Sequence, residues 1–194
     1  MPLTGNVSEN ADKTKNFSMT GVKENAQNTV TANAFVSGYR DTPDPTKLNA
    51  PQYGVAGGSV NVESRGHSMG VAAQHIPNFG DKVTGSANLN LVNADRHKVD
   101  AHAFFTQTIP KAHPNFATHG GGVDYSFMNK HGASASVTHT PMFKQTDYNV
   151  GGHLNLHKTP TSYLDFNMGA SKSSSPFSNG RWDKQGAFSF RKEF

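Results

Sequence analysis

The sequence contains no cysteine among its 194 residues. This absence excludes a disulfide-stabilised scaffold, a catalytic thiol and a thiolate metal site, although it leaves the redox compartment open. Charged side chains make up only 16% of the chain and apolar ones 34%, and no apolar run approaches the roughly 18 residues of a membrane-spanning helix. The first ten residues, MPLTGNVSEN, show no apolar segment of a signal peptide. Retention inside the cell is therefore one expectation for its location.

The charge balance is weakly basic. The 18 lysines and arginines outnumber the 14 acidic residues, which gives a net charge of +4 and a pI of about 9.3. The sign favours an anionic partner, but the magnitude is too small to indicate nucleic acid. Ten histidines would add positive charge in mild acid, because imidazole ordinarily titrates near pH ~6.5. The expected partner is an anionic surface, with neither nucleic acid nor a small-molecule substrate.

Residues 1–54 differ from the remainder of the chain. They hold five basic residues, five acidic residues, two of the 13 phenylalanines and no histidine. The segment RDTPDPTKLNAP at 40–51 contains three prolines and has no periodicity. This composition predicts a mostly disordered N-terminal arm, in which a short strand is expected at residues 28–36.

From Gly57 onward, apolar and polar residues alternate, which predicts antiparallel strands. SANLNLVN at 86–93 and HKVDAHAFF at 97–105 flank the turn residues ADR and predict a hairpin. Similar alternation covers 120–129, 131–139, 148–156, 162–170 and 186–194. Ten of the apolar residues are predicted to share one buried interior: Leu89, Leu91, Phe105, Tyr125, Phe127, Leu154, Leu156, Phe166, Phe188 and Phe190.

The chain also repeats itself. The pattern H-x-P-x-F at residues 75–79 recurs 64 positions later (139 − 75), and ANLNL and VDAHA return as GHLNL and LDFNM at an offset of 65 (152 − 87 and 164 − 99). The repeat predicts two tandem glycine-rich β units, 55–118 and 119–194, behind the arm at 1–54. We expect an all-β fold, as an antiparallel barrel or barrel-like sandwich of about eight or nine strands.

Three segments carry a family resemblance: NLNLVNADRHKVDAHAFFTQ at 88–107, PNFATHGGGVDYSFMNKHGASASVTHT at 114–140 and LNLHKTPTSYLDFNMGASKSSSPF at 154–177. Together they resemble attacin, the glycine-rich antibacterial protein family of insects, over roughly residues 55–194. The resemblance implies a non-enzymatic immune effector that acts mainly on Gram-negative bacteria, at the outer membrane and its lipopolysaccharide. It also implies an extracellular location in the haemolymph, and it allows oligomers on membranes.

The alternative function is a self-assembling structural or storage β protein without antibacterial activity, because polar strands with little charge tend to pair at their edges. An enzyme is not expected, since no nucleophile–base pair or paired carboxylates are visible, and no cofactor is expected. His153 and His157, with Asp165 nearby, are interpreted as polar residues of a solvated strand face rather than metal ligands. The sequons at Asn6 and Asn16 are interpreted as coincidental.

The candidate contacts to an anionic envelope are basic residues in the predicted turns. A meander of antiparallel strands brings alternate turns to the same end. One end is predicted to carry Lys82, Lys111, Lys144, Lys172 and Arg181, and the other Arg65, Arg96, Lys130 and Lys158.

Overall fold

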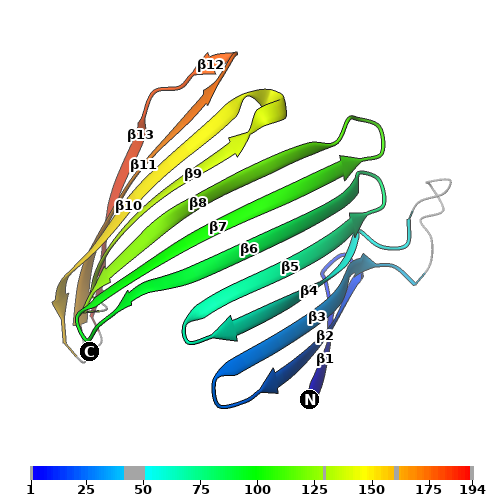
Figure 1. Ribbon diagram of the computed structural model, residues 1–194, viewed down its shortest axis with the longest axis horizontal. Coiled ribbons are helices and arrows are strands. Elements are labelled where there is room, and N and C mark those ends of the chain that lie inside the picture. Colours follow the sequence, from blue (N-terminus) through cyan, green and yellow to red (C-terminus); the bar gives the residue numbers. More distant parts are fainter. Residues whose placement is uncertain (1, 42–50, 129, 160–161, 193–194) are drawn as a thin grey trace. The chain divides into compact units, whose positions relative to one another are not determined.

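A computed structural model of the protein describes residues 2–41, 51–128, 130–159 and 162–192. Within them the chain forms a 13-stranded sheet and one turn of 3-10 helix, η1 (Pro141–Phe143). The strands follow one another in chain order from β1 to β12, and β13 pairs with β11 (Figure 1). The all-β antiparallel prediction is confirmed. No helix in these residues is long and apolar enough to cross a bilayer.

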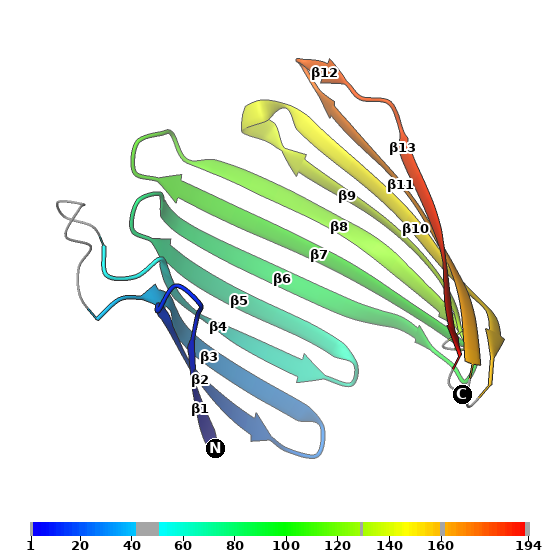
Figure 2. The same cartoon turned by 180° about the vertical axis from the view of Figure 1, so that it is seen from behind.

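The chain divides into two compact units. The first comprises Met1–Ala87 and Phe105–Ala117. Figure 2 shows its first five strands side by side in chain order. Its elements are β1 (Leu3–Glu9), β2 (Lys15–Glu24), β3 (Asn28–Tyr39), β4 (Val55–Ser64), β5 (His67–Ile76), the first part of β6 (Gly80–Asn93) and the second part of β7 (His97–Pro110).

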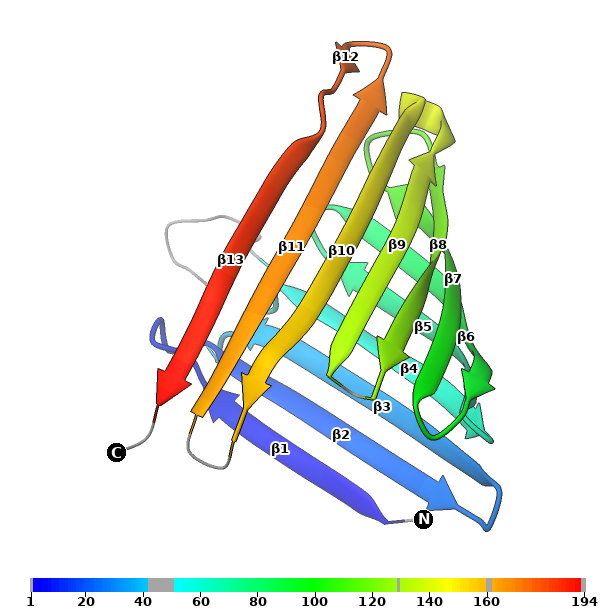
Figure 3. The same ribbon diagram turned by 90° about the vertical axis from the view of Figure 1, so that its left-hand side faces the viewer.

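The second unit comprises Asn88–Phe104 and Thr118–Phe194. Figure 3 shows its later strands, with β13 beside β11. Its elements are the remaining parts of β6 and β7, followed by β8 (Phe116–Phe127, from Thr118), β9 (His131–Thr140), β10 (Gln145–Lys158), β11 (Ser162–Ser175), β12 (Ser178–Asn179) and β13 (Asp183–Lys192).

The predicted disordered arm is wrong for the described part of residues 1–54. Strands β1, β2 and β3 occupy it, and β3 contains the short strand expected at 28–36. Residues 42–50, which include most of the proline-rich segment, lie outside the described residues. The polar residues that suggested disorder lie in strands instead. Every backbone donor and acceptor in a strand needs a partner, and pairing between these strands supplies it.

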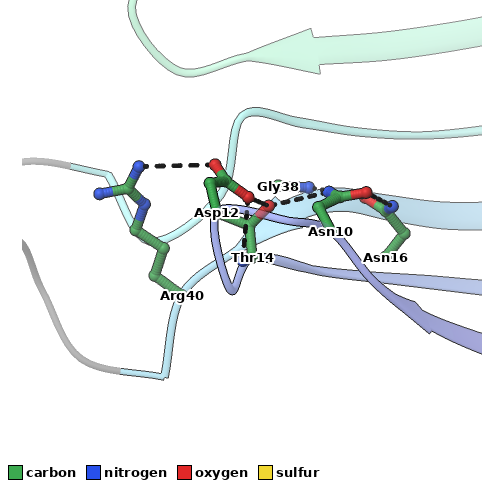
Figure 4. A network of polar contacts seen from close by, with 6 residues as sticks. All are labelled: Asn10, Asp12, Thr14, Asn16, Gly38 and Arg40. Carbon is green, nitrogen blue, oxygen red and sulfur yellow. Dashed lines mark hydrogen bonds and ion pairs between the residues drawn. The ribbon is translucent and has the colours of Figure 1, made fainter.

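Short polar side chains order the connection between β1 and β2 (Figure 4). Asp12 accepts hydrogen bonds from the Thr14 backbone N–H at 3.1 Å and from the Thr14 hydroxyl at 2.7 Å. The Arg40 guanidinium lies 4.0 Å from the same carboxylate. These contacts, the Thr14 hydrogen bonds first, lower the pKa of Asp12. On β2, the Asn16 side-chain oxygen accepts the Gly38 backbone N–H at 3.0 Å.

Each unit has two unlike faces, because successive side chains of a strand point to opposite sides. In the first unit, Val60 opposite Val71 and Val62 opposite Met69 lie on what we call its apolar face. In the second unit, the apolar face carries Phe166 and Met168 of β11, together with the residues that pair with them. The polar faces carry mainly Ser, Thr, Asn and Asp from the alternate positions.

The predicted buried interior is wrong. Among the described residues no hydrophobic side chain is buried, and Leu91, Phe105 and Phe190 are 58%, 51% and 67% exposed. The predicted strand count and the barrel or sandwich are wrong as well, because the described pairings form one sheet whose outer strands, β1 and β13, each have a single partner strand. Alternation fixes which face is apolar, and small Ala, Gly and Ser residues occupy too many apolar-face positions to fill an interior.

Glycines of equivalent strands in the two units lie beneath aromatic rings. A Cβ atom on Gly57 of β4 would lie 3.1 Å from the Phe35 ring, and one on Gly120 of β8 would lie 2.9 Å from the Phe104 ring. Each would also lie 2.5 Å from a backbone carbonyl oxygen of the next strand. Both positions therefore require a residue without a side chain, as expected where another group approaches a strand closely.

Candidate functional site

A groove crosses the apolar face of the second unit where β9, β10 and β11 carry small residues. Gly152 on β10 lies between Ala133 on β9 and Met168 on β11, and the neighbouring pair joins Val150 to Ala170. Because these residues are short, they leave a volume of about 570 Å³ between larger neighbours. The larger side chains that line the groove are Tyr125, His131, Leu154 and Met168.

Two lysines share the face of this groove, one lining it and one beyond its end on β11. Lys184 on β13 lines it and pairs with Ala170. Lys172 lies two residues beyond Ala170 on β11, opposite Tyr148 and on the same face. An apolar groove beside two ammonium groups suits a ligand that joins hydrocarbon to an anionic group.

Aromatic and histidine side chains border the same face near the β8–β9 connection. Tyr125 and the Nδ1 atom of His97 share a hydrogen bond of 2.8 Å, and the His97 ring lies 5.0 Å from the Phe127 ring. Phe127 in turn stacks on His131 at 6.2 Å between ring centroids. Rings with one polar atom are suited to a boundary between hydrocarbon and water.

The apolar face of the first unit has a similar groove of about 470 Å³. Small residues again lie in its middle, where Gly58 pairs with Ala34 and with Ala73, and Leu3 and Met19 lie at its margin. No lysine or arginine is among the described residues that line it. The combination of groove and cations therefore distinguishes the second unit.

In the first unit, the side chains of two of the predicted basic residues reach the connection between β5 and β6. The Lys82 ammonium lies 5.4 Å from the centroid of the Phe79 ring. The Lys111 ammonium donates a hydrogen bond to the Pro77 carbonyl, and its backbone N–H donates to the Phe79 carbonyl at 2.8 Å. Both side chains thus contact this connection, and Lys82 lies within β6 rather than in a turn.

In the second unit, the predicted contacts occupy three different settings. Lys144 follows η1 with φ of 47°, and its N–H donates to the Pro141 carbonyl at 3.0 Å. Arg181 lies between β12 and β13. The turn placement is wrong for Lys172, which lies inside β11. Of the opposite set, Arg65, Arg96 and Lys130 lie in connections and Lys158 ends β10. A role for any of these residues in envelope binding stays a prediction.

On the polar face of the second unit, two carboxylates accept hydrogen bonds from side-chain amide groups. The Asn90 side chain donates to Asp100 at 2.7 Å, and the Asn155 side chain donates to Asp165 at 2.6 Å. The bond from Asn90, followed by that from Lys98, lowers the pKa of Asp100. These two pairs stand at the 65-residue offset of the sequence repeat.

The predicted common face of His153 and His157 is wrong. His153 lies 3.4 Å from Asp165. A register shift between Asn155 and His157 places His157 opposite Leu164, which lies on the apolar face with Phe166, so the two histidines lie on different faces. In the part of the chain that the structure describes, no three His, Asp or Glu side chains are grouped as metal ligands.

Comparison with known proteins connects this chain to one family. The family described as "Attacin, C-terminal region" matches residues 77–194. The chain is 43% identical to defense protein 3 of Lonomia obliqua and 44% identical to attacin-B of Hyalophora cecropia, over 81% of this chain and 66% of each relative. It is 40% identical to an attacin of Bombyx mori, over 81% of this chain and 73% of that one. The chain thus spans about two thirds of the length of these curated relatives.

One solved structure has a similar fold. An anion-selective porin from Comamonas acidovorans matches with a TM-score of 0.57 over 88% of this chain and 54% of the porin chain. The two sequences are 10% identical over this match, so the similarity concerns the arrangement of the strands alone.

Proposed function

Because the chain belongs to the attacin family, we propose that it is an antibacterial defence protein that acts without enzymatic turnover on the outer membrane of Gram-negative bacteria. Relatives named attacin and defense protein support the defence role. The proposed location is outside the cell, in the haemolymph, as the defence role of the relatives supports. The proposed target is lipopolysaccharide.

The observation that carries the proposal is the groove of the second unit with Lys172 and Lys184 on the same face. Lipopolysaccharide joins acyl chains to phosphate groups. In this proposal an acyl chain lies along the small residues of the groove, and the two ammonium groups contact phosphate.

The apolar contact is the larger energetic contribution. Burial of hydrocarbon stabilises a complex by about 0.8 kcal/mol for each methylene group, so five or six methylenes in the groove could contribute about 4–5 kcal/mol. An exposed ion pair contributes only about 0–1 kcal/mol. The lysines therefore select an anionic lipid and orient it, while the groove supplies most of the affinity.

The test compares two double variants for binding to lipopolysaccharide. Lys172→Gln with Lys184→Gln removes both cations at the groove, and Lys82→Gln with Lys111→Gln removes the same charge from the first unit. At about 0–1 kcal/mol each, the groove variant should bind several-fold to roughly tenfold more weakly, whereas the matched control, whose lysines lie away from the groove, should lose clearly less. The parent should also weaken with added salt. Equal losses in both variants would show that only net charge matters, and would refute the groove.

The biological arm is growth inhibition by the purified protein. Gram-negative bacteria should be inhibited at concentrations that leave Gram-positive bacteria unaffected, because only the former carry lipopolysaccharide. The groove variant should inhibit less than its control. Equal potency against both kinds of bacteria would contradict an action on the outer membrane.

A further inference from the structure

The two outer strands of the sheet, β1 and β13, are exposed along their whole length. All seven residues of β1 and all ten of β13 are exposed. In the described pairings, β1 has β2 as its partner and β13 has β11. An edge strand presents N–H and C=O groups to which another strand can bind. We infer that β13 of one copy of this chain pairs antiparallel with β1 of a second copy.

The hydrogen-bonding pattern of β1 determines which of its residues direct their backbone N–H and C=O groups away from β2. These are called the open residues. The Val22 N–H donates to the Pro2 carbonyl at 3.3 Å. Because hydrogen-bonded positions alternate along an antiparallel strand, the even-numbered residues of β1 bond to β2. The odd-numbered residues direct their backbone groups to the open edge, and these are Leu3, Gly5, Val7 and Glu9.

The same reasoning applies to β13. The Gly180 N–H donates to the Ser173 carbonyl at 3.1 Å, so the odd-numbered residues of β11 bond towards β12 and β13. Their partners on β13 are also odd-numbered, as in the pair of Ser171 with Asp183. The even-numbered residues direct their backbone groups to the open edge, and these include Lys184, Gly186, Phe188 and Phe190.

These open residues are also the ones whose side chains lie on the apolar faces. On β1, Gly5 pairs with Met19 of the first apolar face. On β13, Phe188 pairs with Phe166 of the second apolar face. Any register that satisfies the backbone hydrogen bonds therefore places the apolar side chains of both copies on the same side of the joined sheet.

One register also matches charge and shape. It places Leu3 opposite Phe190, Gly5 opposite Phe188, Val7 opposite Gly186 and Glu9 opposite Lys184. Glu9 is the one charged residue of β1, and a cross-strand pair of opposite charges is favourable by about 0.2–1 kcal/mol.

This register also sets Phe188 opposite Gly5, as Phe35 stands opposite Gly57 within the chain, and it sets Val7 opposite Gly186. A shift by two residues in either direction would place Glu9 opposite Gly186 or Trp182 and lose the charge pair. Charge and shape therefore select the same register.

The test uses the absence of cysteine in the natural sequence. In the inferred register Asn6 lies opposite Ala187 at a position without backbone hydrogen bonds, where side chains approach closely enough for a disulfide. Asn6→Cys mixed with Ala187→Cys under mild oxidation, without lipid, should yield a linked heterodimer of two 20.9 kDa chains. Asn6→Cys mixed with Ser189→Cys is the control, since Ser189 lies opposite Thr4 in this register.

The inference is overturned if the control mixture links as efficiently as the Ala187 mixture, or if neither links. It is also overturned if a chain carrying both Asn6→Cys and Ala187→Cys forms its disulfide internally at every concentration, because the pairing would then lie within one chain. Reversal of the charge pair gives a second measurement by sedimentation. Glu9→Lys and Lys184→Glu should each weaken association several-fold, and together they should restore it; failure to restore would refute the register. Because lipid is absent, these results do not depend on the proposed function.

Discussion

Substitution of Gly120 by alanine tests whether the ring above this glycine excludes a side chain. The added Cβ would lie 2.5 Å from the Val137 carbonyl oxygen, 2.9 Å from the Phe104 ring and 3.0 Å from the Thr138 hydroxyl. The carbonyl belongs to β9, so it cannot move without disturbing the pairing of β8 with β9. Gly120→Ala should therefore force these two strands apart locally.

The expected magnitude combines two opposing effects. Overpacking costs about 1–3 kcal/mol, whereas alanine in place of glycine gains about 0.4–1 kcal/mol by restricting the unfolded chain. A net loss of about 1–2 kcal/mol in the free energy of unfolding is expected. This is a large fraction of the roughly 5–15 kcal/mol that is typical of a folded protein.

Gly169→Ala is the matched control, because it lies in β11 of the same unit. Its Cβ would meet the Gln185 side chain at 3.4 Å, an ordinary contact. Urea unfolding, followed by circular dichroism and by the fluorescence of Trp182, the one tryptophan of the chain, should show the control at or above the stability of the parent. If Gly120→Ala unfolds at the same midpoint as the control, the close approach of the Val137 carbonyl and the Phe104 ring to this position is refuted.

Two further predictions concern the first unit. The lowered pKa of Asp12 means that its ionised form stabilises the fold above its unfolded pKa, and that this contribution is lost as the pH falls through the folded pKa. Asp12→Asn should therefore be less stable than the parent at neutral pH, with a difference that narrows below pH 3.8; a constant difference down to pH 2 would contradict it. Met69 and Val71 are 68% and 59% exposed on the apolar face. Their replacement by Thr should change the free energy of unfolding by less than about 0.5 kcal/mol and, because the proposed lipid site lies in the second unit, leave binding to lipopolysaccharide-containing vesicles unchanged; a drop in stability typical of a core substitution would refute their exposure.

The sequence predicted the strands best where local signals agreed. The hairpin at 86–105 combined strict alternation with the polar turn ADR, and the structure has β6 and β7 on either side of residues 94–96. Alternation and turn chemistry act over a few residues, so no distant contact is needed to interpret them.

Strands β1 and β2 were missed because composition outweighed pattern, and only a short strand was expected where β3 lies. That short strand rested on TVTANAF at 29–35, which repeats the alternation of KVDAHAF at 98–104. Asn and Thr are frequent in disordered segments, but within a strand they bond across to a neighbour, as the Asn33 side chain does to the Thr20 hydroxyl at 2.9 Å. A sequence composition does not reveal whether such partners exist.

The candidate site was only partly predictable. Lys172 was a predicted contact, but the prediction placed it in a turn. The alternation of Leu164, Phe166, Met168 and Ala170 continues to Lys172 at every second residue, which indicates a strand. Lys184 was missed, although it precedes Gly186, Phe188 and Phe190 in the same phase. The groove itself depends on small residues of three strands lying side by side, and the cross-strand register that aligns them comes from the folded sheet.

The exposed apolar faces link stability to binding. Hydrophobic burial normally supplies the main favourable contribution to folding, but no hydrophobic side chain is buried among the described residues. Whatever covers an apolar face therefore removes from water the same residues that would form a core elsewhere, at about 25 cal/mol per Å². A ligand that binds the folded chain alone stabilises it in proportion to the logarithm of its concentration. A lipid on the groove and a second copy at the edge strands would thus both stabilise the fold, and alternation in the sequence serves either partner equally well because it specifies only that one face is apolar.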